Sequence, residues 1–124
     1  YNDFENYINH RNNTSTTRKE DLTHRFYTLM MDNYREHKEV IFYADKLHVS
    51  SKYLSEVVKE TSGKSPKDWI IDYSLLEIKE LLKNSSLNIQ EITIRTKFLN
   101  QSALGRFFKR HTNMSPSEYR ESTY

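Results

Sequence analysis

The 124-residue chain contains no cysteine, which excludes disulfide bonds, thiolate metal sites and thiol catalysis. It contains only two glycines and two prolines, the residues that most often interrupt helices, so an all-helical fold is favoured. No apolar run approaches the roughly 20 residues that a membrane-spanning helix needs, and we expect no signal peptide. We expect one small domain or two very small ones.

Acidic residues are also absent from one stretch, residues 95–117, which contains five arginines and lysines. The net charge of the whole chain is only +2, so the distribution of charge is more informative than its total. A helix in this stretch would present a cationic face with no acidic side chain to neutralise it. Such a face suits a groove lined by phosphates.

The residues of this stretch predict a capped amphipathic helix and the start of another. Asn100 can cap a helix whose apolar stripe contains Leu104, Phe107 and Phe108. Asn113 tolerates the left-handed conformation that ends a helix, and the sequence SPSE at 115–118 has the cap, proline and acidic residue of a new helix start. The polar face of the predicted helix carries Gln101, Ser102, Arg106, Lys109 and Arg110.

The same pattern occurs fifty positions earlier, in Ser50–Trp69, where apolar, capping and stop residues recur together. The equivalent pairs are Leu54 and Leu104, Val57 and Phe107, Val58 and Phe108, Lys59 and Lys109, Gly63 and Asn113, Ser65 and Ser115, Pro66 and Pro116, Asp68 and Glu118, and Trp69 and Tyr119. Because register, caps and stops all recur, the chain contains an internal structural repeat.

Both repeats resemble the two helix-turn-helix units of the AraC/XylS-type transcription regulators. The resemblance covers roughly residues 22–120 and rests on YADKLHVSSKYLSEVVKETSGKSPKDWI and FLNQSALGRFFKRHTNMSPSEYR. It implies an all-α fold with two helix-turn-helix subdomains joined by a long connecting helix. It also implies that the protein binds double-stranded DNA sequence-specifically, without a cofactor or catalytic activity. It also implies a cytoplasmic protein, with RNA polymerase as a partner and no membrane contact. Because the chain lacks an initiator methionine, we expect it to be a fragment of a longer protein. The resemblance implies that an upstream sensor or dimerisation domain completes that protein.

The expected organisation follows the repeats. Residues 1–20 are expected to be a linker or the end of an upstream domain, with a short helix in 1–10 and a polar linker in 12–17. Residues 21–124 form the DNA-binding domain. Its first helix is expected from Leu22 to about Glu36, with Asp21 as its cap. The other predicted parts are a first helix-turn-helix at about 39–63, a connecting helix at about 66–83 and a second helix-turn-helix at about 88–113.

Two features of this organisation bear on DNA. The connecting helix of about eighteen residues would span about 27 Å. Reading helices that enter successive major grooves lie about 34 Å apart, so a rigid connector would hold them near that separation. The turn of the second unit is one residue longer than the turn of the first, where His48 and Val49 precede the cap Ser50.

Side chains near the start of each reading helix should reach base edges. Arg106 can bond to O6 and N7 of guanine, and Gln101 to N6 and N7 of adenine. Glu56 either accepts from cytosine N4 or is a solvated charge. The base-reading candidates are Ser51, Lys52, Ser55 and Glu56 in the first unit and Gln101, Ser102, Gly105 and Arg106 in the second; the family resemblance assigns contacts to all of these except Ser51 and Gly105.

Lys59, Lys109 and Arg110 lie further along the reading helices. Each could be a solvated surface charge, but the acid-free cluster as a whole favours contact with phosphates. Two positions depart from the family. Many members have glycine where Lys97 stands and phenylalanine where Leu104 stands. A left-handed Lys97 would cost about 1 kcal/mol relative to glycine, so either the turn is rearranged or the cost is accepted for an added positive charge near DNA. Leu104 keeps the core apolar but is smaller, so we expect the second unit to be looser.

Two other classes of function have less support from the sequence. A protein–protein adaptor could have kept the helical fold, but the cationic face would then be incidental. A small enzyme has little support. The five histidines do not have the spacing of metal ligands, and nothing in the sequence places a histidine beside a nucleophile or a carboxylate pair. Fusion to alkylated-DNA repair, which occurs in some relatives, needs a reactive cysteine that this chain lacks.

Overall fold

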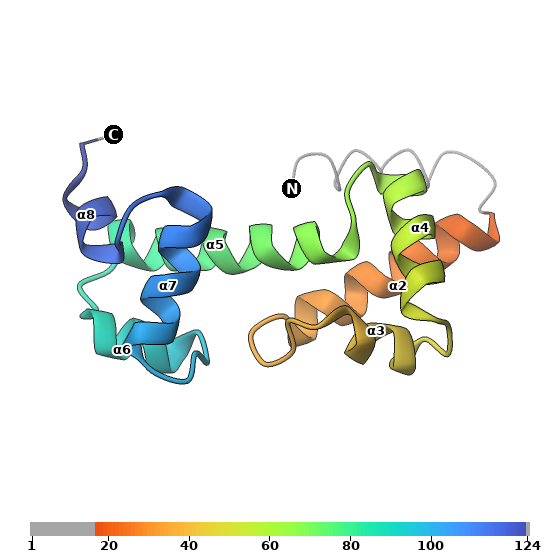
Figure 1. Cartoon of the computed structure of the whole chain (residues 1–124), viewed down its shortest axis with the longest axis horizontal. Helices are drawn as coiled ribbons and strands as arrows, with labels where there is room; N and C mark the ends of the chain where they lie inside the picture. The colour runs from red at the N-terminus through yellow and green to blue at the C-terminus, as the bar shows by residue number, and fades with distance from the viewer. Residues whose placement is uncertain (1–16, 124) are drawn as a thin grey trace. The chain divides into compact units, whose positions relative to one another are not determined.

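The computed structural model describes residues 17–123, and every regular element in that range is an α-helix (Figure 1). The described helices are α2 (Arg18–Asn33), α3 (Val40–Lys46), α4 (Ser51–Ser62), α5 (Pro66–Asn84), α6 (Ile89–Arg95), α7 (Gln101–Thr112) and α8 (Pro116–Glu121). The all-α fold with two helix-turn-helix units and a long connecting helix is therefore confirmed. The predicted helix in 1–10 lies outside the described residues, as does nearly all of the predicted linker.

The chain divides into two compact units, and the division falls within α5, between Tyr73 and Ser74. In the first unit, α2 packs against α3 and α4, and the first part of α5 completes the core. The most deeply buried side chains of this core are Phe26, Met30, Tyr43, Ala44, Leu54, Val58, Trp69 and Ile70. The small side chain of Ala44, only 1% exposed, allows α3 to approach its neighbouring helices closely.

The second unit repeats this arrangement, with the later part of α5 in the place of α2. Its core contains Ile78, Leu82, Ile92, Leu104, Phe108 and Tyr119, and Phe98 and Phe107 pack against it. Leu104 is fully buried, as is its counterpart Leu54. Because truncating a buried leucine leaves a cavity, replacing either leucine by alanine is expected to cost about 2–5 kcal/mol.

Helix starts and stops agree closely with the sequence. Ser50 Oγ accepts from Tyr53 N and Asn100 Oδ1 from Ala103 N, so α4 and α7 both have the expected caps. The stops, Gly63 and Asn113, have φ values of 88° and 64°. Ser115 and Glu118 form the reciprocal capping box of α8.

The start of α2 was wrongly predicted. The helix begins at Arg18 and not at Leu22, because Thr17 caps it and not Asp21. Thr17 Oγ1 accepts from Glu20 N while Glu20 Oε1 accepts from Thr17 N, which is a complete capping box at the end of the polar run. The helix also ends at Asn33, three residues before the expected Glu36, because the chain turns at 34–36.

Candidate nucleic-acid interface

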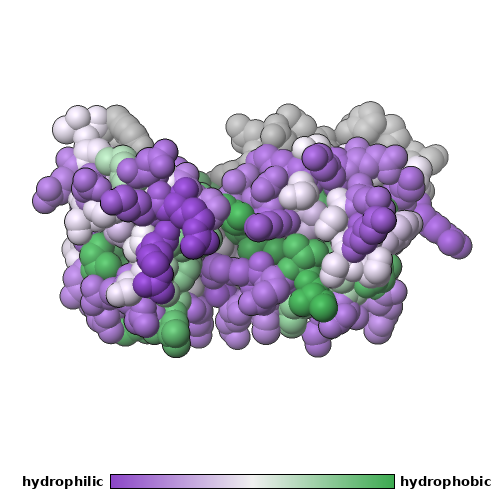
Figure 2. Space-filling view, in the orientation of Figure 1, coloured by the Kyte–Doolittle hydropathy of each residue, from purple (hydrophilic) through white to green (hydrophobic). Residues whose placement is uncertain are grey.

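The α7 helix presents one buried and one polar face. Leu104 and Phe108 are fully buried, while the five polar candidates of this helix are all exposed: Gln101, Ser102, Arg106, Lys109 and Arg110. Figure 2 shows strongly hydrophilic side chains gathered over α7. Within residues 17–123, Arg106, Lys109 and Arg110 have no ion-pair partner within 4.0 Å. Their charges are therefore available to an anionic ligand.

One acidic side chain lies near this face. The carboxyl of Glu118, at the start of α8, accepts from the backbone N–H of Ser115 at 2.8 Å. The backbone N–H and hydroxyl of Ser115, and to a lesser extent the charge of Lys109, lower the pKa of the Glu118 carboxyl. Glu118 therefore stays ionised at neutral pH and partly balances Lys109, whereas Arg106 stands one turn nearer the start of α7.

An exposed hydrogen bond connects the start of α7 to α6. Gln101 Nε2 donates to Gln90 Oε1 at 2.7 Å. This contact restrains the Gln101 amide and leaves its own oxygen and second amide hydrogen for a ligand. Sequence patterns did not identify Gln90, because it lies eleven positions before Gln101 and no helical or repeat spacing connects the two residues.

The α4 helix of the first unit has the same faces but a different charge. Lys52, Glu56 and Lys59 are exposed, Ser51 and Ser55 are half-buried, and Leu54, Val57 and Val58 are buried. Glu56 and Glu60 occupy the positions of Arg106 and Arg110 in α7. Glu60 accepts from Lys19 Nζ of α2 at 3.0 Å, whereas Glu56 has no ion-pair partner within the described range. The exposed faces of α4 and α7 thus have the same arrangement of buried and exposed positions but differ in net charge.

The turn before each reading helix has one left-handed residue, His48 in the first unit and Lys97 in the second. Of the two alternatives for Lys97, the left-handed conformation is the one observed, with φ of 65°. The extra residue of the second turn is Leu99, whose side chain is 91% exposed. It stands directly before the cap Asn100.

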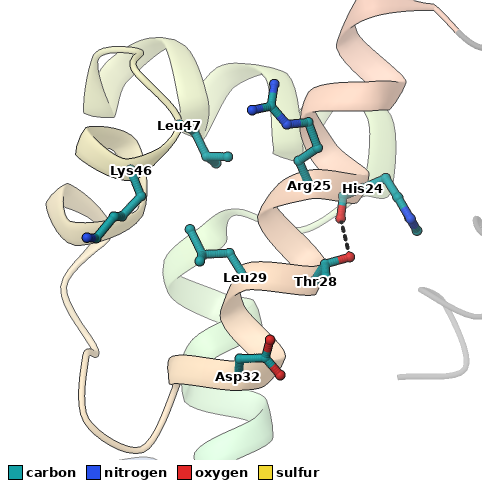
Figure 3. A pocket seen from close by; sticks show the side chains of 7 residues that line it. All are labelled: His24, Arg25, Thr28, Leu29, Asp32, Lys46 and Leu47. Atoms are coloured by element: carbon teal, nitrogen blue, oxygen red, sulfur yellow. Dashed lines mark hydrogen bonds between the residues drawn. The ribbon is translucent and has the colours of Figure 1, made fainter.

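A separate groove of about 450 Å³ lies in the first unit between α2 and α3 (Figure 3). Leu29 of α2 and Leu47, the residue directly after α3, point into the groove. Arg25, Asp32 and Lys46 also line it, while the side chain of His24 is directed away. Thr28, the remaining lining residue, donates to the His24 carbonyl at 3.1 Å. No nucleophile and base face each other in this groove, and residues 17–123 contain no group of acidic or histidine side chains that could hold a metal.

The described helices include none that is both long and apolar enough to cross a membrane. The structure contains two repeated units, and each unit packs a capped helix with an exposed polar face against a buried core. This architecture defines a double helix-turn-helix domain. Comparison with known proteins agrees with this class.

A model of the helix-turn-helix domain family matches residues 43–122, well over half of the chain. The HTH-type transcriptional regulator YobQ of Bacillus subtilis is 32% identical over 77 residues, which cover 62% of this chain and 32% of that protein. The chain thus spans about a third of the length of this relative. The chain belongs to the helix-turn-helix family of AraC/XylS-type transcription regulators.

Solved structures share the fold. The C-terminal domain of AraT, a response regulator from Geobacillus stearothermophilus, matches with a TM-score of 0.74 and 25% identity over 86% of this chain and 89% of that domain. The DNA-binding domain of AdpA, a global transcriptional factor solved in complex with a target DNA, matches with a TM-score of 0.66 and 23% identity. That match covers 79% of this chain and 88% of the AdpA chain.

Proposed function

We propose that this chain is the sequence-specific, double-stranded-DNA-binding output domain of a transcription regulator, and that it acts without catalysis. The observation that carries the proposal is the exposed, acid-free face of α7, where Arg106, Lys109 and Arg110 have no ion-pair partner among residues 17–123. Cations without an ion-pair partner, gathered on the exposed face of an amphipathic helix, are the electrostatic footprint of a phosphate-binding surface.

The contacts divide into two kinds. Arg106 and Gln101 stand in the first half of α7, where side chains reach base edges in the major groove, and Ser102 stands beside them. Lys109 and Arg110, in the last turn, contact phosphates. In α4, the residues Ser51, Lys52, Ser55 and Glu56 read bases, and Lys59 contacts a phosphate.

The two reading helices are proposed to enter successive major grooves. Support comes from α5, one continuous helix of 19 residues that is about 28 Å long at 1.5 Å per residue. The spacing of successive grooves on one side of the duplex is about 34 Å. In the cell the domain would act in the cytoplasm, joined to an upstream sensor or dimerisation domain and in contact with RNA polymerase.

A salt titration tests the proposal. If about five cations among Lys52, Lys59, Arg106, Lys109 and Arg110 meet phosphates, log affinity for a labelled duplex should fall against log salt with a slope of about −4 to −5. Fluorescence anisotropy at several salt concentrations measures this slope. A slope near zero, or no binding at low salt, would reject DNA binding and favour the adaptor.

A further inference from the structure

We propose that Gly105 marks the place where α7 approaches DNA most closely, and that the space over it receives the methyl group of a thymine. This inference rests on the proposed function, since it names a base recognised at the same surface.

The fold itself does not require a glycine at position 105. Gly63, the other glycine, ends α4 with φ of 88°, but Gly105 lies inside α7 and has no positive φ. A Cβ added at Gly105 would meet no atom within 4 Å. Because glycine loses more backbone entropy than alanine inside a helix, this residue weakens α7 without serving any contact among the described residues.

The position of Gly105 places the gap on the proposed DNA-binding face. Gly105 is half-buried and lies one turn after Gln101 and one turn before Lys109, beside the exposed Arg106. Its counterpart in α4 is Ser55. The missing side chain therefore leaves open space on this stretch of α7, with no atom within 4 Å of an added Cβ; we call this space the notch.

The notch suits an apolar group. The backbone N–H and C=O of a residue inside a helix are already bonded within the helix, so Gly105 offers no donor or acceptor to a base. The thymine methyl is the apolar group that base pairs present in the major groove. The adenine paired with that thymine presents N6 and N7, which suit the amide of Gln101, held one turn away by Gln90. A single A·T pair thus offers both partners.

A protein–DNA double-mutant cycle tests the notch. A duplex selected from a random library is remade with deoxyuridine, which lacks the methyl, at each thymine in turn. Loss of one buried methyl should weaken binding of the natural domain about three- to fivefold at one thymine. In Gly105→Ala the alanine methyl occupies the notch, so the affinity for the thymine duplex should fall. The variant should then bind the thymine duplex and the deoxyuridine duplex with about equal affinity.

Two controls make the result specific. Gly105→Ala should raise the melting temperature of the free domain, because alanine favours the helix, so weaker binding would not reflect unfolding. Ser55→Ala, at the equivalent position of α4, should leave the thymine-to-deoxyuridine ratio at that base pair unchanged. A selected site with no thymine dependence, or an unchanged ratio in Gly105→Ala, overturns the notch while leaving DNA binding intact. No binding to any duplex overturns the proposed function as well.

Discussion

Lys97 and His48 occupy the same left-handed backbone position in the two turns, with φ values of 65° and 60°. The residue after each donates its backbone N–H five residues back, from Val49 to Ala44 at 3.0 Å and from Phe98 to Thr93 at 3.1 Å. The two turns are therefore copies of one motif despite the additional Leu99. Because non-glycine residues are disfavoured in this region, each turn carries a local cost of about 1 kcal/mol.

Replacing Lys97 by glycine should relieve that cost. We expect Lys97→Gly to raise the free energy of unfolding by up to about 1 kcal/mol, and to weaken non-specific DNA binding slightly because one cation is lost. A urea titration followed by circular dichroism measures the stability. His48→Gly is the matched variant, since it relieves the same conformation in the first unit without removing a lysine. Clear destabilisation by Lys97→Gly would contradict the strain account.

The capping box of α8 should make stability depend on pH. The folded-state pKa of the Glu118 carboxyl is lowered, chiefly by the backbone N–H of Ser115 and next by its hydroxyl. A group with a depressed folded pKa stabilises the fold above its unfolded pKa, and this contribution is lost as pH falls through the folded value. We expect the urea midpoint to fall between about pH 5 and pH 3, and Glu118→Gln to remove part of that dependence. An NMR titration giving Glu118 an ordinary or raised pKa would refute this.

The first unit should contribute sequence choice more than charge. Ser55 is half-buried on the reading face of α4, and Ser55→Asn changes its hydrogen-bonding groups without changing its charge. We expect this variant to alter preference at one base pair by about 1–3 kcal/mol and to leave the salt slope unchanged. Library selection with each protein measures the preference.

Lys59→Ala is the contrasting variant in the same helix. It should reduce the salt slope by about one unit and leave the selected sequence as it is. Identical selected sites for Ser55→Asn and the natural domain would mean that α4 does not read bases at this position.

Local signals predicted most of the fold. The caps at Ser50, Asn100 and Ser115 and the stops at Gly63 and Asn113 depend on neighbouring residues alone, so the sequence contains all the information they need. Thr17 was missed for a different reason: its capping box with Glu20 lies at the end of a polar run that resembles a linker.

Other features depend on contacts between distant residues. Glu60 forms an ion pair with Lys19, 41 positions away, and Gln101 of α7 donates a hydrogen bond to Gln90 of α6. Neither pair follows a helical or repeat spacing, so no periodic pattern in the sequence could have predicted them. The charge difference between α4 and α7 was predictable, because it follows directly from the repeat alignment.

The most direct test of the account compares Arg106→Ala with Lys109→Ala on a selected operator and on a scrambled duplex. Arg106 stands near the start of α7, where it can bond to O6 and N7 of guanine, while Lys109 stands in the last turn. We predict that Arg106→Ala costs about 1–3 kcal/mol on the operator, with a smaller loss on the scrambled duplex, and relaxes choice at one base pair. Lys109→Ala should weaken both duplexes alike and reduce the salt slope by about one unit. Equal losses on both duplexes for Arg106→Ala would contradict base reading by α7 and leave specificity to the first unit.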